Sequence, residues 1–182
     1  MRRAPRREWR VPWHSQVTDF TNKTWRSQGC GIAALQSVIE FWKPELRKET
    51  CDDLFAEGVA IGAYMSGVGW RHAGLVSLAR QYGLDGYNAD FAPQSKTPES
   101  PVASLELLRK ALAQGPVIAS VWKDFHPRSK SGHLVVVVGA DGGHVVVQDP
   151  LESTREKGYR VLTNDQFLAG FRQRFICIVS RL

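Results

Sequence analysis

The chain has 182 residues, of which 43% are hydrophobic and six are Trp, so we expect one domain with a substantial core. Five arginines against Glu8 give residues 1–10 a charge of +4, which leaves +2 of the formal net charge of +6 for the rest of the chain. The basicity is confined to this arm, and no basic stripe with interleaved aromatic residues follows it. The sequence therefore argues against nucleic-acid binding and predicts a solvated arm that at most contacts an anionic surface weakly.

No stretch approaches the ~18 apolar residues of a membrane-spanning helix, and no apolar run follows the basic N-terminus as it would in a secretory signal. We therefore expect a cytoplasmic protein. The three cysteines are widely spaced, which disfavours a disulfide framework, and the closely paired Cys or His ligands of structural zinc sites do not occur in the sequence. The sequence predicts no metal and no other cofactor, and it leaves the oligomeric state open.

Helical periodicity dominates the first part of the chain. Apolar residues recur at helical intervals over 32–42, and Pro44 ends this run. A second, short helix is expected from Cys51 to Ala56, followed by a glycine-rich connection over 58–69. Further helices are expected over 72–82 and 105–113, each followed by a glycine. The polar stretch 93–101 between them is typical of an irregular surface loop.

Alternating or continuous β-branched patterns dominate the second part, and they predict strands over 117–122, 133–138, 144–148, 159–161 and 175–179. Residues 140–143, Ala-Asp-Gly-Gly, are typical of a hairpin turn, and 163–167 of a short capped helix. This order predicts an α+β fold in which an N-terminal helical part packs on a C-terminal, mostly antiparallel sheet. Residues 11–182 would form one domain.

Cys30 stands between two glycines where a loop changes into the apolar-periodic helix. The partial positive charge at a helix N-terminus stabilises a thiolate over a thiol and so lowers the pKa of a cysteine. The small neighbours leave the sulfur open to a substrate. Cys30 is therefore a candidate nucleophile. Cys177, inside an apolar strand, is expected to be a small buried hydrophobic residue, and the same is expected of Cys51.

A histidine and an aspartate follow Cys30 in chain order, namely His133 at the start of a valine-rich strand and Asp149 before Pro150. Cysteine, histidine and carboxylate are the nucleophile, base and orienting group of a hydrolase. Upstream, the side-chain amide of Gln16 is a candidate donor to an oxyanion. Asp149 also fits a local Asp-Pro turn, and His126 is the main rival for the base.

The position of the hairpin turn determines whether the side chains of His133 and Asp149 lie close together. A two-residue loop at 141–142 would place His133 opposite Pro150, and a loop at 142–143 would place it opposite Glu152. Either register leaves Asp149 near the His133 end of the hairpin, at an offset of a few residues of about 3.3 Å each. Packing of the Cys30 helix on this sheet would complete the set.

Five features in this order give the chain a resemblance to a known family: Pro-aromatic-x-x-Gln over 12–16, the Cys30-Gly31 helix start, Gln-Gly-Pro-Val-Ile over 114–118, Gly132-His133 and Asp149-Pro150. The chain resembles the papain-like cysteine peptidases, in the branch related to the bacteriocin-processing peptidases that cut after a double-glycine leader. The resemblance implies a papain-like fold and hydrolysis of a peptide or isopeptide bond in a peptide or protein substrate through a thioester. It also implies catalytic roles for Cys30, His133 and Asp149, with Gln16 as oxyanion donor.

Several alternatives stay open at this stage. Trp13, Trp70 and Phe125, like Tyr64, lie in or beside segments that would border the cleft, so they are candidates for substrate contacts or for core packing. The same site would suit an acyltransferase or transglutaminase-like enzyme with an amine acceptor, or a catalytically silent peptide-binding module. Because the transporter and ATPase usually fused to bacteriocin-type peptidases are not in this sequence, leader removal coupled to export is not expected.

Overall fold

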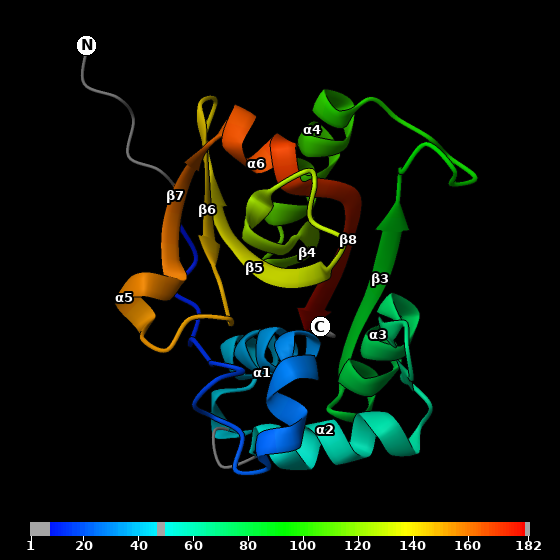
Figure 1. Cartoon of the computed structure of the whole chain (residues 1–182), viewed down its shortest axis with the longest axis vertical. Coiled ribbons are helices and arrows are strands. Elements are labelled where there is room, and N and C mark those ends of the chain that lie inside the picture. The colour runs from blue at the N-terminus through cyan, green and yellow to red at the C-terminus, as the bar shows by residue number, and fades with distance from the viewer. Residues whose placement is uncertain (1–7, 47–49, 181–182) are drawn as a thin grey trace.

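The computed structural model of the chain describes residues 8–46 and 50–180. Its centre is a six-stranded sheet with the strand order β3-β8-β4-β5-β6-β7 (Figure 1). Every neighbouring pair of strands in it is antiparallel. The strands are β3 (Leu84–Asp90), β4 (Val117–Trp122), β5 (Gly132–Ala140), β6 (His144–Gln148), β7 (Tyr159–Thr163) and β8 (Phe171–Ser180). The α+β class predicted from the sequence is confirmed.

Helices cover both faces of the sheet. On one face lie α1 (Cys30–Trp42), α2 (Cys51–Ala60) and α3 (His72–Gln81), and on the other lie α4 (Pro101–Leu112) and α6 (Asn164–Gly170). Successive strand residues alternate between two cores: Ile118 packs with the first group of helices, whereas Val117 and Ala119 pack with the second. Shorter elements are η1 (Lys23–Gln28), η2 (Pro44–Leu46), η3 (Lys123–Phe125), α5 (Arg155–Gly158) and the hairpin β1 (Tyr64–Met65) with β2 (Gly69–Trp70).

The glycine-rich connection is shorter than expected, because α2 continues past Ala56 to Ala60. Gly58 lies inside this helix, where a Cβ atom would be 2.6 Å from the ring of Trp70. The glycine is therefore explained by close packing of the ring on the helix, and not by a flexible turn. Helix α4 likewise starts earlier than expected, at Pro101, because Ser100 caps it and proline is well suited to the first turn.

Strand β3 was not predicted. Its sequence, Leu-Asp-Gly-Tyr-Asn-Ala-Asp, has no β-branched residue and contains the types that strands disfavour. It is an edge strand that pairs with β8 from Leu84↔Ser180 to Asp90↔Arg174. The backbone ladder to its neighbour, a long-range interaction, thus outweighs the local preference of these residues.

The β5–β6 hairpin begins in one of the two expected registers and then leaves it. Near the turn, Ala140 pairs with Val145 and Gly139 with Val146, as a loop at 142–143 requires. A bulge at Val138 then shifts the pairing by one residue, so that Val137 faces Val147 and Val136 faces Gln148. The expected positions of His133, opposite Pro150 or Glu152, are therefore both wrong by one residue.

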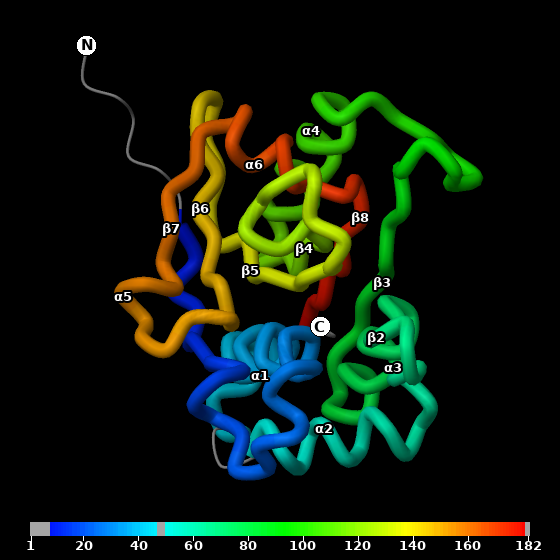
Figure 2. Tube along the Cα trace, in the orientation of Figure 1, coloured from blue at the N-terminus to red at the C-terminus, as the bar shows by residue number. Residues whose placement is uncertain are grey.

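The chain from Glu8 onward lies against the sheet (Figure 2). Glu8 bridges to Gly139, and the backbone N–H of Trp9 donates to the carbonyl of Val138 at 2.8 Å. The indole N–H of Trp9 donates to the carbonyl of Leu112. The last three residues of the expected arm, 8–10, are thus attached to the fold, whereas residues 1–7 lie outside the described residues. In the described part of the chain, no helix has the length and apolar character needed to cross a bilayer.

Candidate active site

Cys30 is the first residue of α1, and Gly29 is its N-cap. A Cβ atom at Gly29 would lie 2.6 Å from the Phe20 ring, and one at Gly31 would lie 2.8 Å from the Trp70 ring. Both glycines are therefore required by rings that pack on the start of the helix. The packing fixes the sulfur at the helix N-terminus, where the backbone N–H of Gly31 hydrogen-bonds to it.

His133 lies between Cys30 and Asp149. Its Nε2 is 2.7 Å from Oδ1 of Asp149, and its ring and the Cys30 thiol are close enough for each to shift the pKa of the other. The side chains of both His133 and Asp149 are at least 95% buried. The structure therefore brings Cys30, His133 and Asp149 together in the order that the sequence predicts for a nucleophile, a base and an orienting carboxylate.

Asp149 is itself held by several neighbours. Its Oδ1 accepts from the backbone N–H of Leu151 at 2.9 Å, and its Oδ2 lies 3.5 Å from the guanidinium of Arg160. Burial raises the pKa of this carboxyl, but the hydrogen bond and charge of His133, with the contributions of Leu151 and Arg160, lower it overall. Asp149 is thus ionised near neutral pH and stabilises a protonated His133.

The thiol and the imidazole shift each other's pKa in opposite directions. Burial raises the pKa of Cys30, but the hydrogen bond to His133 and its charge outweigh this effect, so the pKa is lowered. Burial lowers the pKa of His133, whereas Asp149 and Cys30 raise it to about 10. The pair therefore favours thiolate and imidazolium. The other two thiols behave in the opposite way, since burial raises the pKa of Cys51 to about 12 and also raises that of Cys177.

Gln16 lies beside the start of α1. Its side chain approaches Gly29, its backbone N–H donates to the carbonyl of Pro150 at 2.8 Å, and its Nε2 donates to the carbonyl of Arg26 at 2.7 Å. It therefore connects the segment before Cys30 to the segment after Asp149. The Nε2 has a second N–H, while the buried Oε1 has no hydrogen-bond partner among the described residues.

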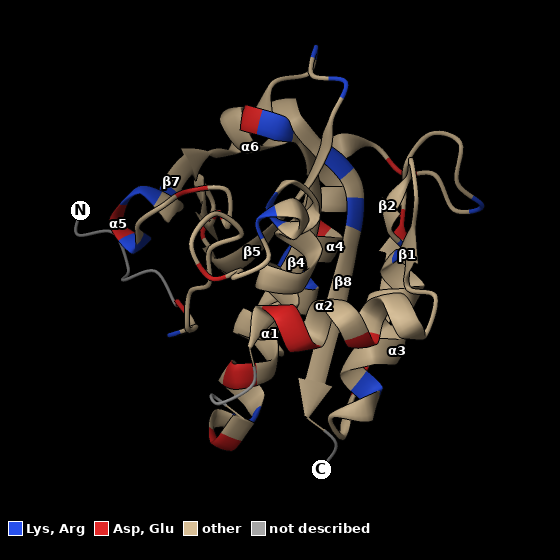
Figure 3. Ribbon diagram, turned by 60° about the horizontal axis from the view of Figure 1, so that its bottom comes forward, with Lys and Arg blue, Asp and Glu red and all other residues tan. Residues whose placement is uncertain are grey.

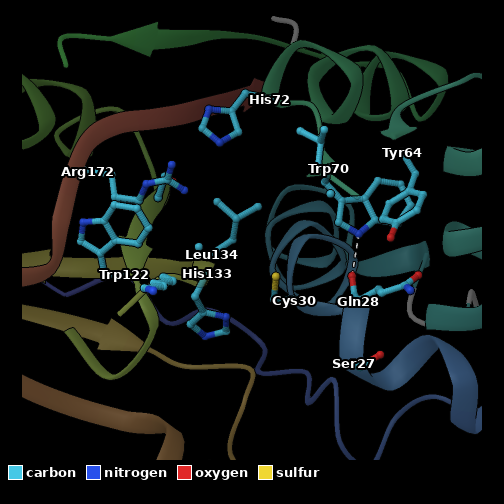
Figure 4. Close-up of a pocket in the computed structure, with 15 residues that line it drawn as sticks. Ser27, Gln28, Cys30, Tyr64, Trp70, His72, Trp122, His133, Leu134 and Arg172 are labelled. Atoms are coloured by element: carbon cyan, nitrogen blue, oxygen red, sulfur yellow. Dashed lines mark hydrogen bonds between the residues drawn. The ribbon is translucent and has the colours of Figure 1, made fainter. Parts of the chain in front are cut away.

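A cavity of about 370 Å³ opens at Cys30 (Figure 4). Figure 4 shows Trp70, Tyr64 and Gln28 on one side of the sulfur and Trp122 and Arg172 on the other. His133 and Leu134 of β5 form part of the wall. The cavity thus lies between the α1 side of the molecule and the sheet, with the thiol and the imidazole both at its surface.

Of the three aromatic residues predicted to contact substrate, one lines this cavity. Trp70 does so, while its indole N–H donates to the carbonyl of Gln28 at 2.7 Å. Trp13 lies elsewhere: its indole donates to the backbone carbonyl of Asp149 at 3.1 Å. Phe125 is buried against Phe167, with Arg160 over its ring. Neither Trp13 nor Phe125 lines this cavity: the Trp13 indole contacts the backbone of Asp149, and Phe125 belongs to the second core, which is the alternative of core packing.

Sequence reasoning missed the opposite wall, formed by Trp122, Arg172, His72 and Lys130. No local pattern singles out these residues, since they end a strand, start a helix or interrupt an apolar run. One signal was available: the polar Arg-Gln-Arg run over 172–174 stands between Phe171 and the continuous apolar part of β8. The rival base His126 lines a separate cavity beside Phe125, and its Nδ1 accepts from the backbone N–H of Arg128.

The described residues contain no cluster of three or more His, Cys, Asp or Glu side chains arranged to hold a metal ion. At the cavity, the residues present supply a thiolate–imidazolium pair with a carboxylate behind it. Such a pair attacks an electrophilic carbon, and the adjacent cavity provides room for the group that carries it.

Comparisons with known proteins agree with this chemistry. The model of the Peptidase_C39 like family matches residues 9–176. The fold is similar to that of a double-glycine-motif protease from an AMS/PCAT transporter, solved in complex with the leader peptide, with 20% identity, a TM-score of 0.60 and coverage of 96% of this chain and 94% of that one. A putative C39-like peptidase from Bacillus anthracis is 17% identical, with a TM-score of 0.66 and coverage of 98% and 99%.

The peptidase domain of Streptococcus ComA, described as a bifunctional ABC transporter in a quorum-sensing pathway, is 16% identical, with a TM-score of 0.59 and coverage of 85% of this chain and 93% of that one. No curated protein sequence matches significantly. At these identities the solved structures show the fold, whereas the family model, which spans most of the sequence, shows the family. The chain belongs to the Peptidase_C39 like family and is a cysteine-type peptidase.

Proposed function

We propose that this peptidase hydrolyses a peptide or isopeptide bond through a thioester on Cys30, with His133 as general base and acid and Asp149 as the orienting group. The observation that carries the proposal is the placement of His133, which is hydrogen-bonded to Asp149 and shares the wall of one cavity with Cys30. The lowered pKa of the thiol, beside two thiols whose pKa is raised, supports Cys30 as the nucleophile.

The thiolate of Cys30 attacks the carbonyl carbon of the scissile bond, so that an S–C bond forms and the carbonyl oxygen takes the negative charge. The imidazolium of His133 then gives its proton to the leaving nitrogen, and the C–N bond breaks to leave a thioester. Water, deprotonated by the now neutral His133, attacks the thioester and releases the acid and the thiolate. Asp149 holds the imidazole in one orientation throughout and stabilises its cationic form.

The oxyanion would be stabilised by two donors, namely the backbone N–H of Cys30 and the second N–H of the Gln16 amide. The position of Cys30 at the N-terminus of α1 supports the first donor, because the first N–H groups of a helix have no partner within it. The packing of the Gln16 side chain beside Gly29 supports the second. Its bond to the carbonyl of Arg26 fixes the plane of the amide.

A peptide substrate is supported by the fold. The similar double-glycine-motif protease was solved with a leader peptide, and the cavity beside Cys30 in this chain is open rather than sealed by the core. Its walls are aromatic and polar, with Trp70 and Tyr64 facing Trp122 and Arg172. We propose that an extended segment of the substrate occupies the space between these walls, with its scissile carbonyl beside the thiol.

The proposal is tested with a peptide library digested by the wild type, by Cys30→Ser and by His133→Ala, with products read by mass spectrometry. We expect cleavage by the wild type and loss of cleavage in both variants. Hydroxylamine added to the wild-type reaction should divert part of the product into a hydroxamate, which reports the thioester. The proposal would be contradicted by cleavage that survives Cys30→Ser. It would also be contradicted by a Cys30 thiol that titrates like a free cysteine in a protein that cleaves no peptide.

A further inference from the structure

Strand β8 has a bulge beside the active-site cavity. On β4, Ser120 pairs with Arg174 and its neighbour Val121 pairs with Phe171, so that Arg172 and Gln173 have no partner on β4. Gln173 has a φ of +57°, which residues other than glycine rarely adopt. Bulges next to active sites commonly redirect a side chain, and here the bulge directs Arg172 into the cavity.

The unusual backbone of Gln173 is firmly held. Its Nε2 donates to the carbonyl of Glu99 at 2.7 Å and to Oγ of Ser104 at 3.0 Å. Its backbone carbonyl accepts from the N–H of Phe91 at 2.9 Å. Strained backbone of this kind persists where the surroundings fix it, and it is concentrated at functional sites. Several hydrogen bonds thus stabilise the backbone conformation that orients Arg172.

The Arg172 guanidinium lies next to the catalytic pair. Its carbon is 4.3 Å from the centre of the Trp122 ring, and a Cβ atom at Gly132 would overlap its Nη1. Gly132 is the cross-strand partner of Trp122 and immediately precedes His133. The glycine therefore leaves the space that the guanidinium fills, one residue before His133 in the chain. Figure 4 shows Arg172 beside Trp122 at the cavity.

Arg172 forms no ion pair with a carboxylate of the described residues, although the charge of Asp90 acts on it from a distance. None of the described residues that line the cavity is acidic, and Lys130 adds a second positive charge. The nearest strand neighbour with a carboxylate, Asp90, is 2.9 Å from Arg174 instead. Figure 3 shows the two basic positions on β8. Burial and the charges of Arg174 and Arg172 lower the pKa of His72 to about 4, so this lining residue is neutral at pH 7.

We propose that Arg172, stacked on Trp122, is a substrate-binding residue that selects a carboxylate close to the scissile bond. The inference rests on the proposed function and adds the substrate class. A guanidinium presents two parallel N–H donors that match a carboxylate, and stacking on an indole fixes their plane in advance. The carboxylate belongs to an Asp or Glu side chain or to the end of a peptide chain, and the test separates the two.

The first experiment compares how fast Cys30 is alkylated by iodoacetate and by iodoacetamide. Both form an S–C bond and release iodide, but only iodoacetate carries a carboxylate. We expect the iodoacetate to iodoacetamide rate ratio to fall roughly tenfold in Arg172→Gln, to fall less in Arg172→Lys, which keeps the charge but loses the paired donors, and to be unchanged in the exposed control Lys110→Gln. An Arg172→Gln ratio equal to that of the wild type would overturn the inference.

The iodoacetamide rate of each variant reports whether its active site is intact. If Arg172→Gln does not fold, the wild type alone decides: succinate should slow alkylation of Cys30 by iodoacetamide, whereas succinamide should not. Equal protection by both compounds would overturn the inference.

Peptide substrates then identify the source of the carboxylate. Cleaved library peptides are resynthesised with Gln for Glu, with Asn for Asp, or with an amide at the C-terminus. We expect one of these changes to lower kcat/KM about tenfold in the wild type and to have little effect in Arg172→Gln. Cleavage that is indifferent to every such change would refute the carboxylate preference and leave the peptidase assignment intact. If no peptide is cleaved, the proposed function fails, and the alkylation ratio still decides the role of Arg172.

Discussion

Nε2 of His133 lies 2.7 Å from Oδ1 of Asp149, although the two residues are 16 positions apart and a bulged hairpin connects them. This hydrogen bond leaves the other ring nitrogen for the Cys30 thiol. It makes the pKa of His133 depend on Asp149, and the pKa of Cys30 depend on His133. The predictions below concern this dependence and the segments that support it.

Removing the Asp149 side chain should abolish most of the activity. For Asp149→Ala we expect kcat/KM to fall by on the order of 10⁴, the size found when the carboxylate of comparable triads is lost. Asp149→Asn should retain more activity, because its amide oxygen still accepts from Nε2. On the alkaline side, however, its activity should fall at a lower pH than that of the wild type, since the charge that holds the imidazolium is gone. Full pH–rate profiles give both effects, with the exposed Asp165→Asn as control. Identical profiles for the wild type and Asp149→Asn would refute the role of the charge.

At pH 6, Cys30 should react with iodoacetamide much faster than Cys51 and Cys177. The reason is that the pKa of Cys30 is lowered by His133, whereas burial raises the pKa of the other two. In His133→Ala the thiol loses its hydrogen bond and the adjacent positive charge, so its reactivity should move to higher pH. Mass spectrometry of the labelled peptides across pH 5–10 measures this directly. A pH profile of Cys30 that does not change in the variant would contradict the ion pair.

Gln16→Ala should lower kcat by about 10²–10³, or ~2.7–4 kcal/mol, the loss seen when one oxyanion donor is removed, with little change in KM. Gln28→Ala is the matched control, because Gln28 is a glutamine that lines the cavity but its side chain extends away from Cys30 in Figure 4. Thermal unfolding of both variants separates catalysis from stability, since Gln16 also bonds to Arg26. Equal activity of the Gln16 variant and the wild type would leave the backbone N–H of Cys30 as the donor.

His14 joins the N-terminal segment to α1, since its ring nitrogens lie 3.0 Å from Oδ2 of Asp19 and 2.9 Å from Oε1 of Glu40. Burial lowers the pKa of His14, but the two carboxylates raise it above 6.5 overall. A raised folded-state pKa adds stability that is complete below the unfolded value and lost as the pH rises through the folded value.

We therefore expect His14→Gln to reduce the free energy of unfolding by about 1–3 kcal/mol at pH 5.5, and by less at pH 9. Urea unfolding at the two pH values measures the difference. The exposed His126→Gln should have little effect at either pH. A loss for His14→Gln that is as large at pH 9 as at pH 5.5 would show that packing, and not charge, accounts for the role of His14.

Local sequence determined much of the fold. The spans 117–122 and 144–148 were predicted to the residue, because β-branched runs bounded by turn residues favour strands strongly. The helix that begins at Cys30 was predicted because apolar residues recur at helical intervals directly after a cysteine that is flanked by glycines. The order of Cys30, His133 and Asp149 also followed from the sequence, since each occurs at a recognisable boundary of an element.

Tertiary structure decided what depends on contacts between distant segments. Strand β3 forms because its backbone pairs with that of β8. The bulge at Val138 sets a register in the β5–β6 hairpin that the turn alone does not predict. The same holds for the site: Trp13 supports Asp149 instead of lining the cavity, and Arg172 reaches it through a strained bulge held by Gln173. The sequence by itself identified the groups proposed for the chemistry, because residue type and local pattern mark them. The walls around that chemistry came from the folded structure, because long-range packing places them.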